Sequence, residues 1–185
     1  MEELTDVALI AAVTGGDRAA FGVLFDRHSP ALYRYAWTVL HNNEDTLDAV
    51  QQTFLVAWKK RRQVRVVDDS ALPWLLTACR FEALNLARQR RRDSERLAPL
   101  ESQQTEPVVL ADSDEHADEL AFILSEISTQ SETDQQVCRL VLREGLTYDQ
   151  AAHALGLTPS AVGKKLERTR KRLRIAREKY REVTQ

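Results

Sequence analysis

Apolar residues recur every three or four positions along most of the chain, and no segment alternates apolar and polar residues as a strand does. The first half of the chain is therefore expected to form helices. Thr5 can cap the first helix, Gly15–Gly16 ends it, and Asp17 is placed to cap the second. We expect the second helix to kink or restart at Pro30, because proline lacks the amide that a helix interior needs.

Two further helices complete this half of the chain. The third, NEDTLDAVQQTFLVAWKKR, directs Leu47, Val50 and Phe54 toward the core. Its other face is polar and includes Asp48, Gln51 and Gln52. The fourth, PWLLTACRFEALNLARQRRR, starts with a proline at a favourable first-turn position, and its apolar run includes Trp74, Leu75, Ala78, Phe81 and Leu84.

The fourth predicted helix ends in a group of arginines, which are Arg88, Arg90, Arg91 and Arg92. Cations suit the last turn of a helix, because they face the negative end of its dipole. A second basic group lies just before this helix and comprises Lys59, Lys60, Arg61, Arg62 and Arg65. The two groups together favour a surface for nucleic acid over a favourable helix end alone.

The clearest local signal is the stretch TYDQAAHALGLTPSAVGKKLERTRKRLR, which begins at Thr147. Thr147 and Gln150 have the spacing of a capping box, so a helix starts there. Thr158, followed by a proline, caps a second helix directly afterwards. A helix-turn-helix needs a small residue, a turn glycine and an apolar hinge residue, and these are Ala152, Gly156 and Val162.

The second helix of this pair is expected to expose Ser160, Lys164, Lys165, Arg168, Thr169, Lys171 and Arg172. The serine and lysines near its start can reach base edges in a major groove, and the later arginines suit phosphates. Gly163 costs this helix about 1 kcal/mol relative to alanine. It either permits a close approach of the backbone to DNA or is only tolerated.

Charge is distributed unevenly, although 26 Lys+Arg against 28 Asp+Glu leave a net charge of −2. Residues 59–93 and 155–185 are each rich in bases, whereas residues 94–119 hold eight acids and a single arginine. That acidic stretch shows no helical period and contains two prolines. We therefore predict an all-α protein with helical domains at 1–93 and 119–182, joined by a flexible acidic linker at 94–118.

Several classes of protein are excluded by what the sequence carries. No apolar run approaches the roughly 18 residues of a membrane helix, and acids near the N-terminus argue against a signal peptide, so a cytoplasmic protein is expected. Cys79 and Cys138 are expected to be buried thiols. The histidines show no metal-ligand spacing, and Asp68–Asp69 lacks a third acid or histidine for a nuclease. We expect no metal, no cofactor and no catalytic residue.

Three stretches in order, DTLDAVQQTFLVAW, then PWLLTACR to RQRRR, then EGLTYDQAAHALGLTPSAVGKKLERTRKRLR, resemble the extracytoplasmic-function (ECF) group of bacterial RNA polymerase sigma factors. The resemblance covers both predicted domains. It implies a sigma-two helical bundle followed by a sigma-four helix-turn-helix domain, acting without covalent catalysis. The implied partners are core RNA polymerase, promoter DNA and an anti-sigma factor.

The resemblance also implies roles for particular residues. Asp48, Gln51 and Gln52 occupy the positions that bind the clamp coiled coil of the polymerase. The loop from about Arg61 to Pro73 and the following helix would read and open the minus-ten element, with a pocket for a flipped base. The basic residues of that region are Arg61, Arg62, Arg65, Arg80, Arg88, Arg90, Arg91 and Arg92. The helix from Ser160 would read the minus-thirty-five element, and the acidic linker would thread toward the RNA exit path.

The chain departs from the family pattern at several positions. Phe81 and Asn85 stand where the family usually has asparagine and aspartate, and Gln130–Ser131 replaces a usual Leu-Pro pair. A stand-alone helix-turn-helix regulator is the alternative function. That alternative explains residues 147–174 but neither the N-terminal domain, the second basic stretch nor the acidic spacer.

Overall fold

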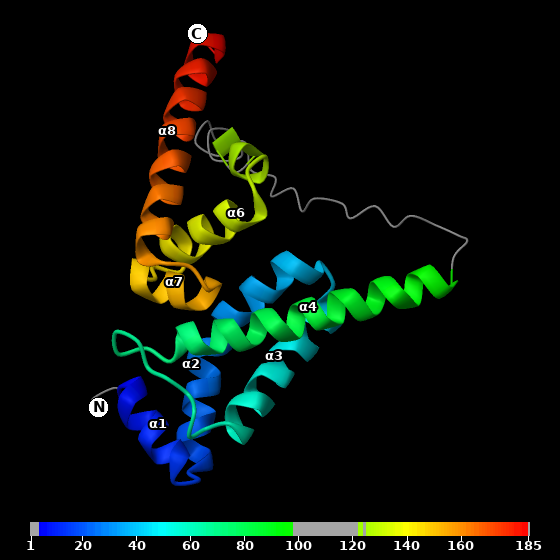
Figure 1. Ribbon diagram of the computed structural model, residues 1–185, viewed down its shortest axis with the longest axis vertical. Helices are drawn as coiled ribbons and strands as arrows, with labels where there is room; N and C mark the ends of the chain where they lie inside the picture. Colours follow the sequence, from blue (N-terminus) through cyan, green and yellow to red (C-terminus); the bar gives the residue numbers. More distant parts are fainter. Residues whose placement is uncertain (1–3, 98–121, 124, 185) are drawn as a thin grey trace. The chain divides into compact units, whose positions relative to one another are not determined.

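The computed structural model describes residues 4–97, 122–123 and 125–184, and these residues are helical apart from caps, turns and one isolated bridge (Figure 1). The chain divides into two compact units, Met1–Thr105 and Glu106–Gln185. The expected all-helical fold with two helical regions is confirmed. Of the flexible linker predicted at 94–118, residues 98–118 lie outside the described residues, whereas residues 94–97 are helical and continue the preceding helix.

The first unit contains α1 (Asp6–Thr14), α2 (Arg18–Leu40), α3 (Asn43–Lys59) and α4 (Leu72–Leu97). The predicted caps are present: the Thr5 side chain accepts a hydrogen bond from the amide of Ala8, and Asp17 accepts from two amides of α2. α2 continues through Pro30, so the helix does not restart there. α4 runs on to Leu97, which leaves Arg88–Arg92 more than a turn before its end. The explanation that these arginines suit a last helical turn is therefore wrong.

Helices α2, α3 and α4 pack on one another, and α1 lies against α2. Leu47 was expected in the core but is 45% exposed. The buried face of α3 instead carries Thr46 and Thr53 beside Val50 and Phe54. Both threonine hydroxyls donate to backbone carbonyls one turn earlier, at 2.6 Å and 2.7 Å. Because these hydroxyls are satisfied within the helix, threonine can take core positions that hydrophobicity alone would assign to leucine.

The expected apolar run of α4 is also partly wrong, because Phe81 is 59% exposed. The face that packs against the other helices carries Leu75, Leu76, Cys79 and Ala83. Cysteine and alanine are small, and the thiol of Cys79 lies 3.8 Å from the carbonyl oxygen of Leu32 on α2. The close approach of these two helices sets the rotation of α4 and turns Phe81 to the opposite side.

The second unit contains a helical segment at 125–128, α6 (Glu132–Cys138), a π-helical turn η1 (Arg139–Arg143), α7 (Tyr148–Leu155) and α8 (Pro159–Thr184). The predicted capping box is present, with Thr147 and Gln150 bonding each other's backbone amides. Gly156 ends α7 at φ 67°, a left-handed conformation that glycine adopts without strain. Ala152 and Val162 are buried where α7 meets α8, as a helix-turn-helix requires.

Candidate nucleic-acid interface

Helix α8 presents a basic face to solvent. Ser160, Lys164, Arg168, Lys171 and Arg172 are exposed, as the sequence predicted. Arg174, three residues after Lys171, is exposed as well and was missed. Its helical spacing from Lys164 and Lys171 was the signal that could have identified it. The exposed cations and the serine hydroxyl near the start of α8 can donate to phosphates and base edges.

Thr169 does not belong to this face. Its side chain is buried, with 1% of the residue exposed, and its hydroxyl donates to the side-chain oxygen of Gln130 at 2.6 Å. The expected exposure of Thr169 is therefore wrong. Its position opposite the exposed cations makes it a polar contact between α8 and the start of α6, and a buried hydroxyl of this kind needs such a partner.

Lys165 is also held inside the second unit. Its ammonium group lies 2.9 Å from Oδ1 of Asp134 on α6, and a guanidinium nitrogen of Arg168 lies 3.7 Å from the same oxygen. Ser131 donates to the other carboxylate oxygen at 2.7 Å. Burial works to raise the pKa of Asp134, but the bonds from Ser131 and Lys165 outweigh it and hold the pKa below its usual value. Lys165 therefore meets a carboxylate, while Lys164 next to it faces solvent.

The basic residues of the first unit likewise divide into exposed cations and cations that have partners within the unit. Arg62, Arg65, Arg88 and Arg92 are exposed, as is Arg91, and Arg80 is half-buried. Arg61 instead lies over the ring of Trp58, with its guanidinium carbon 5.1 Å from the ring centre, and donates to the carbonyl of Trp58. Arg90 forms an ion pair with Asp45 near the start of α3 and donates to its second oxygen at 2.7 Å. These two arginines stabilise the first unit.

The loop between α3 and α4 closes in a tight turn. Val67 and Ser70 exchange backbone hydrogen bonds of 2.9 Å and 3.1 Å. Asp68 and Asp69 between them have φ values of 46° and 58°, in the left-handed region that aspartate tolerates better than most residues. Two carboxylates therefore stand at the tip of the loop that leads into α4.

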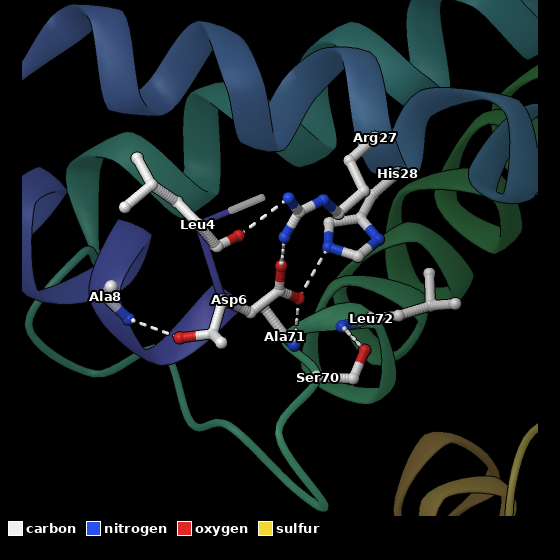
Figure 2. Close-up of polar contacts among 9 residues, drawn as sticks. Leu4, Asp6, Ala8, Arg27, His28, Ser70, Ala71 and Leu72 are labelled. Atoms are coloured by element: carbon white, nitrogen blue, oxygen red, sulfur yellow. Dashed lines mark hydrogen bonds and ion pairs between the residues drawn. The ribbon is translucent and has the colours of Figure 1, made fainter. Parts of the chain in front are cut away.

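The end of this loop is anchored by Asp6 (Figure 2). One oxygen of the buried Asp6 carboxylate accepts from Arg27 at 2.6 Å, and the other accepts from His28 and from the amide of Ala71, both at 2.7 Å. Burial would raise the pKa of Asp6, but the hydrogen bonds from His28, Ala71 and Arg27 lower it to about 2. The sequence alone does not reveal this role of Asp6, because its partners lie 21, 22 and 65 positions away along the chain.

The outer face of α3 combines polar and apolar groups. Gln51 and Gln52 are exposed and Asp48 is half-buried, with the Gln52 amide 3.4 Å from the Asp48 carboxylate. Leu47 and Leu55 are exposed on the same face. A surface hollow of about 330 Å³ adjoins it, lined by Phe21, Phe25, Gln51, Phe54, Leu55 and Trp58. Exposed leucines beside such a hollow are typical of a surface that binds another protein.

The two cysteines of the chain are buried. Cys79 and Cys138 are both buried free thiols, and burial raises the pKa of Cys79 to about 12. A thiol with so high a pKa is unreactive at neutral pH. Within the described ranges, no helix combines the length and the apolar character that crossing a bilayer requires.

Two helical units, one of them a helix-turn-helix with an exposed basic face, are the architecture of a DNA-binding protein. Residues 24–93 match the family model "Sigma-70 region 2". Among curated proteins, the chain is 25% identical to the ECF RNA polymerase sigma factor SigK of Mycobacterium tuberculosis strain H37Rv, with 90% of each chain covered. It is 24% identical to SigK of Mycobacterium ulcerans, with 84% of each covered.

Solved structures agree. The structure of CnrH in complex with the cytosolic domain of CnrY matches with a TM-score of 0.62 at 28% identity, covering 90% of this chain and 93% of that one. The sigma factor RpoE in complex with the anti-sigma factor NepR from Bartonella quintana shares the fold, with a TM-score of 0.55 at 24% identity and coverages of 80% and 90%. The chain belongs to the ECF sigma factors and directs transcription initiation with RNA polymerase. It is not an enzyme.

Proposed function

We propose that the two units divide promoter recognition between them, with α8 reading the minus-thirty-five element and the loop 61–71 with α4 reading the minus-ten element. The observation that carries the proposal is the exposed basic face of α8, which follows a complete helix-turn-helix. Ser160 and Lys164 lie in its first turns, where the side chains of a recognition helix reach base edges. Arg168, Lys171 and Arg172 follow, and they are placed for phosphates.

In the first unit, the exposed cations are assigned to the minus-ten region. These are Arg62, Arg65, Arg88, Arg91 and Arg92, with the half-buried Arg80. Arg61 and Arg90 support the fold through Trp58 and Asp45. Asp6 holds the end of the loop against α1 and α2 through Ala71. A loop fixed at this end can offer a base pocket of constant shape, which lowers the entropic cost of capturing a flipped base.

The outer face of α3 is the proposed contact with core RNA polymerase. Asp48, Gln51 and Gln52 supply its polar part. Leu47 and Leu55 add apolar area, whose removal from water is the main favourable term in most protein–protein association. The structure of this face therefore favours a mixed contact over a purely polar one.

The experiment combines this chain with core RNA polymerase and a library of promoter sequences. We expect co-elution with core and transcript starts that depend on the added chain. Co-elution without any new transcript start would contradict the promoter assignment. The absence of both co-elution and new transcript starts would contradict the proposed polymerase contact as well.

A pair of matched variants tests the α3 face. Leu55 and Leu142 are 50% and 51% exposed, on α3 and on η1 respectively. Leu55→Asp should weaken binding to core by at least tenfold, because an aspartate would be desolvated against an apolar contact. Leu142→Asp should leave binding unchanged, and both variants should keep their helical circular dichroism. Equal loss in both variants would move the contact away from α3.

We further propose that an anti-sigma factor holds this chain inactive, in the cytoplasm where its polymerase partner works. The support is that the similar structures of CnrH and RpoE are both complexes, CnrH with the cytosolic domain of CnrY and RpoE with the anti-sigma factor NepR. The apolar hollow beside Leu55 offers a place for such a partner. We expect the anti-sigma partner and core RNA polymerase to compete for binding to the chain. We expect this competition to be lost in Leu55→Asp.

A further inference from the structure

The loop before α4 is held at its end by side chains from α1 and α2 (Figure 2). Nε2 of His28 and the amide of Ala71 both lie 2.7 Å from the same oxygen of the Asp6 carboxylate. Arg27 donates to the other oxygen and also to the carbonyl of Leu4, at 2.6 Å and 2.7 Å. These three side chains and the Ala71 amide are called the Asp6 anchor below. The anchor ties the loop to two helices that lie far away in the sequence.

The inner part of the Asp6 anchor is closed to solvent. Asp6 and His28 are 3% and 6% exposed, and Ala71 is fully buried. A buried carboxylate needs partners that replace its water, and here α2 and the loop supply them together. Because His28 and Asp6 are buried, they can influence a bound DNA only by way of the loop.

Ala71 directly follows the tight turn that carries two acids at its tip. The backbone bonds between Val67 and Ser70 close this turn. The hydroxyl of Ser70 accepts from the amide of Leu72 at 3.2 Å, which joins the turn to the first residue of α4. The position of Ala71 therefore sets where the whole turn stands.

The beginning of the loop is held less firmly by α1. There the hydroxyl of Thr14 lies 3.4 Å from the carbonyl oxygen of Arg61, which is long for such a bond. The bond from Ala71 to the ionised Asp6 is shorter and charge-assisted, and bonds of this kind are about twice as strong as neutral ones. The Asp6 anchor is thus the stronger of the two contacts through which α1 fixes the loop.

A loop that selects one base over another needs a fixed position. Specificity is a difference between two affinities, and a loop that can shift adapts to the wrong base and reduces that difference. A loop that is already fixed in the free protein also loses less freedom when it binds. The Asp6 anchor can therefore contribute to base discrimination without touching a base.

We propose that His28 and Asp6 are positioning residues for the minus-ten element, holding the turn at 67–70 in the place from which the loop discriminates between bases. His28 orients the Asp6 carboxylate, and Asp6 fixes the amide of Ala71. The inference rests on the proposed assignment of the loop to the minus-ten element. It adds two buried residues that act on promoter choice through the position of the backbone.

The test uses holoenzyme formed from the full chain and core RNA polymerase. Three templates are compared: a promoter recovered from the library, the same promoter with one base pair changed in the minus-ten element, and the same promoter with one base pair changed in the minus-thirty-five element. The readout is the ratio of transcript starts on the original promoter to those on each changed template. Partial unfolding of a variant lowers all three alike and cancels in the ratios, so a merely structural role would not move them.

The first pair of variants separates the hydrogen bond from the side-chain volume. His28→Leu removes the donor to Asp6, whereas His28→Gln keeps an amide donor. We expect His28→Leu to lower the minus-ten ratio by about fivefold, the low end of what one mismatched base pair costs, and to leave the minus-thirty-five ratio within about twofold. His28→Gln should recover most of the minus-ten ratio.

Two further variants complete the design. Thr53→Val removes a buried hydroxyl of α3 that bonds within its own helix, and it should leave both ratios unchanged. Arg27→Gln replaces His28→Leu if that variant does not fold, because the Arg27 side chain is 25% exposed and binds the same carboxylate. It should lower the minus-ten ratio in the same direction.

Three results would overturn the inference. The minus-ten ratio could stay unchanged in His28→Leu and Arg27→Gln, or both ratios could fall equally, which would make the effect general to the promoter complex. Equal losses in His28→Leu and His28→Gln would show that the bond to Asp6 is not what matters. In each case the original chain still discriminates at the minus-ten element, so the proposed function stands. If the original chain starts equally well on the promoter and on the changed minus-ten template, the proposed role of the loop fails first.

Discussion

A single carboxylate, Asp6, joins three segments of the first unit that are distant in sequence. Its folded pKa of about 2 lies below the ordinary value of 3.8. A group whose pKa is lowered by folding stabilises the protein above its unfolded pKa, and this stabilisation is lost as the pH falls through the folded pKa. At about 1.4 kcal/mol per pKa unit, Asp6 contributes about 2 kcal/mol that disappears between about pH 4 and pH 2.

Asp6→Asn should therefore destabilise the first unit by about 2 kcal/mol at pH 7 and flatten its acid denaturation between pH 4 and pH 2. Urea unfolding followed by tryptophan fluorescence measures this directly, because all three tryptophans lie in the first unit, at 37, 58 and 74. Asp26→Asn on α2 is the control, since Asp26 is exposed. Equal acid sensitivity in both variants would show that Asp6 is not the titrating group.

Asp134 has the corresponding place in the second unit, where its carboxylate forms an ion pair with Lys165 and lies near Arg168. If α8 binds DNA with Lys165 still paired, Lys165→Ala should leave the salt dependence of binding unchanged, whereas Lys164→Ala should flatten its slope by about 0.9. Asp134→Asn should release Lys165 and make the slope steeper. These slopes come from titrations of holoenzyme on promoter DNA at several salt concentrations. A flatter slope for Lys165→Ala would mean that DNA displaces Asp134.

Residues such as Thr5, Asp17 and Thr147 could be identified from sequence, because a cap bonds to amides within three residues. The pairs that decide which cations are available could not. Asp134 lies 31 positions from Lys165, and Asp45 lies 45 positions from Arg90. Such contacts depend on how whole helices pack, so a count of basic residues overestimates the nucleic-acid surface.

At the scale of elements, the existence and ends of most helices follow from the sequence, but their rotation does not. Periodicity alone favours the largest apolar residues for the core, and so it placed Leu47 and Phe81 there. In α3 and α4 the packed faces instead carry threonine, alanine and cysteine, which allow the helices to approach closely. The large residues Leu47 and Phe81 are turned outward instead, where they can contact other molecules.

Gly163 lowers the helix propensity of α8, and the structure shows which neighbouring element it faces. A Cβ at this position would lie 3.5 Å from the ring of Tyr148 on α7, an ordinary contact distance. The glycine therefore faces α7 and not the exposed basic side. Gly163→Ala should stabilise the second unit by about 0.5–1 kcal/mol and leave DNA affinity unchanged. Thermal unfolding followed by circular dichroism gives the first result, and promoter titration the second. A tenfold loss of DNA affinity would show that the backbone approaches DNA at this glycine.

For the whole molecule, a net charge of −2 conceals two basic surfaces on separate units. Exposed charges more than about 10 Å apart are largely screened at 0.1 M salt, so local surfaces govern binding and the net charge does not. Acidic residues accumulate elsewhere, including the first turn of α3 and residues 94–119. A chain of this kind is expected to bind promoter DNA weakly alone, and to bind it well when the polymerase fixes both units on one duplex.

The division between the two units can be tested with one arginine from each, Arg88 on α4 and Arg172 on α8, both exposed. On a complete promoter, each change to alanine in the holoenzyme should flatten the salt slope by about 0.9, and the double variant by about twice as much, because distant sites act independently.

Removing the upstream element from the template separates the two roles. Arg172→Ala should then have no effect, since its proposed phosphate is gone, while Arg88→Ala should keep its full effect. If Arg172→Ala still flattened the slope on the shortened template, α8 would be bound elsewhere, and the proposed order of the two units along the promoter would be wrong. The result depends only on which DNA each arginine touches, so it tests the arrangement of the whole chain on the promoter without relying on the stability of either unit.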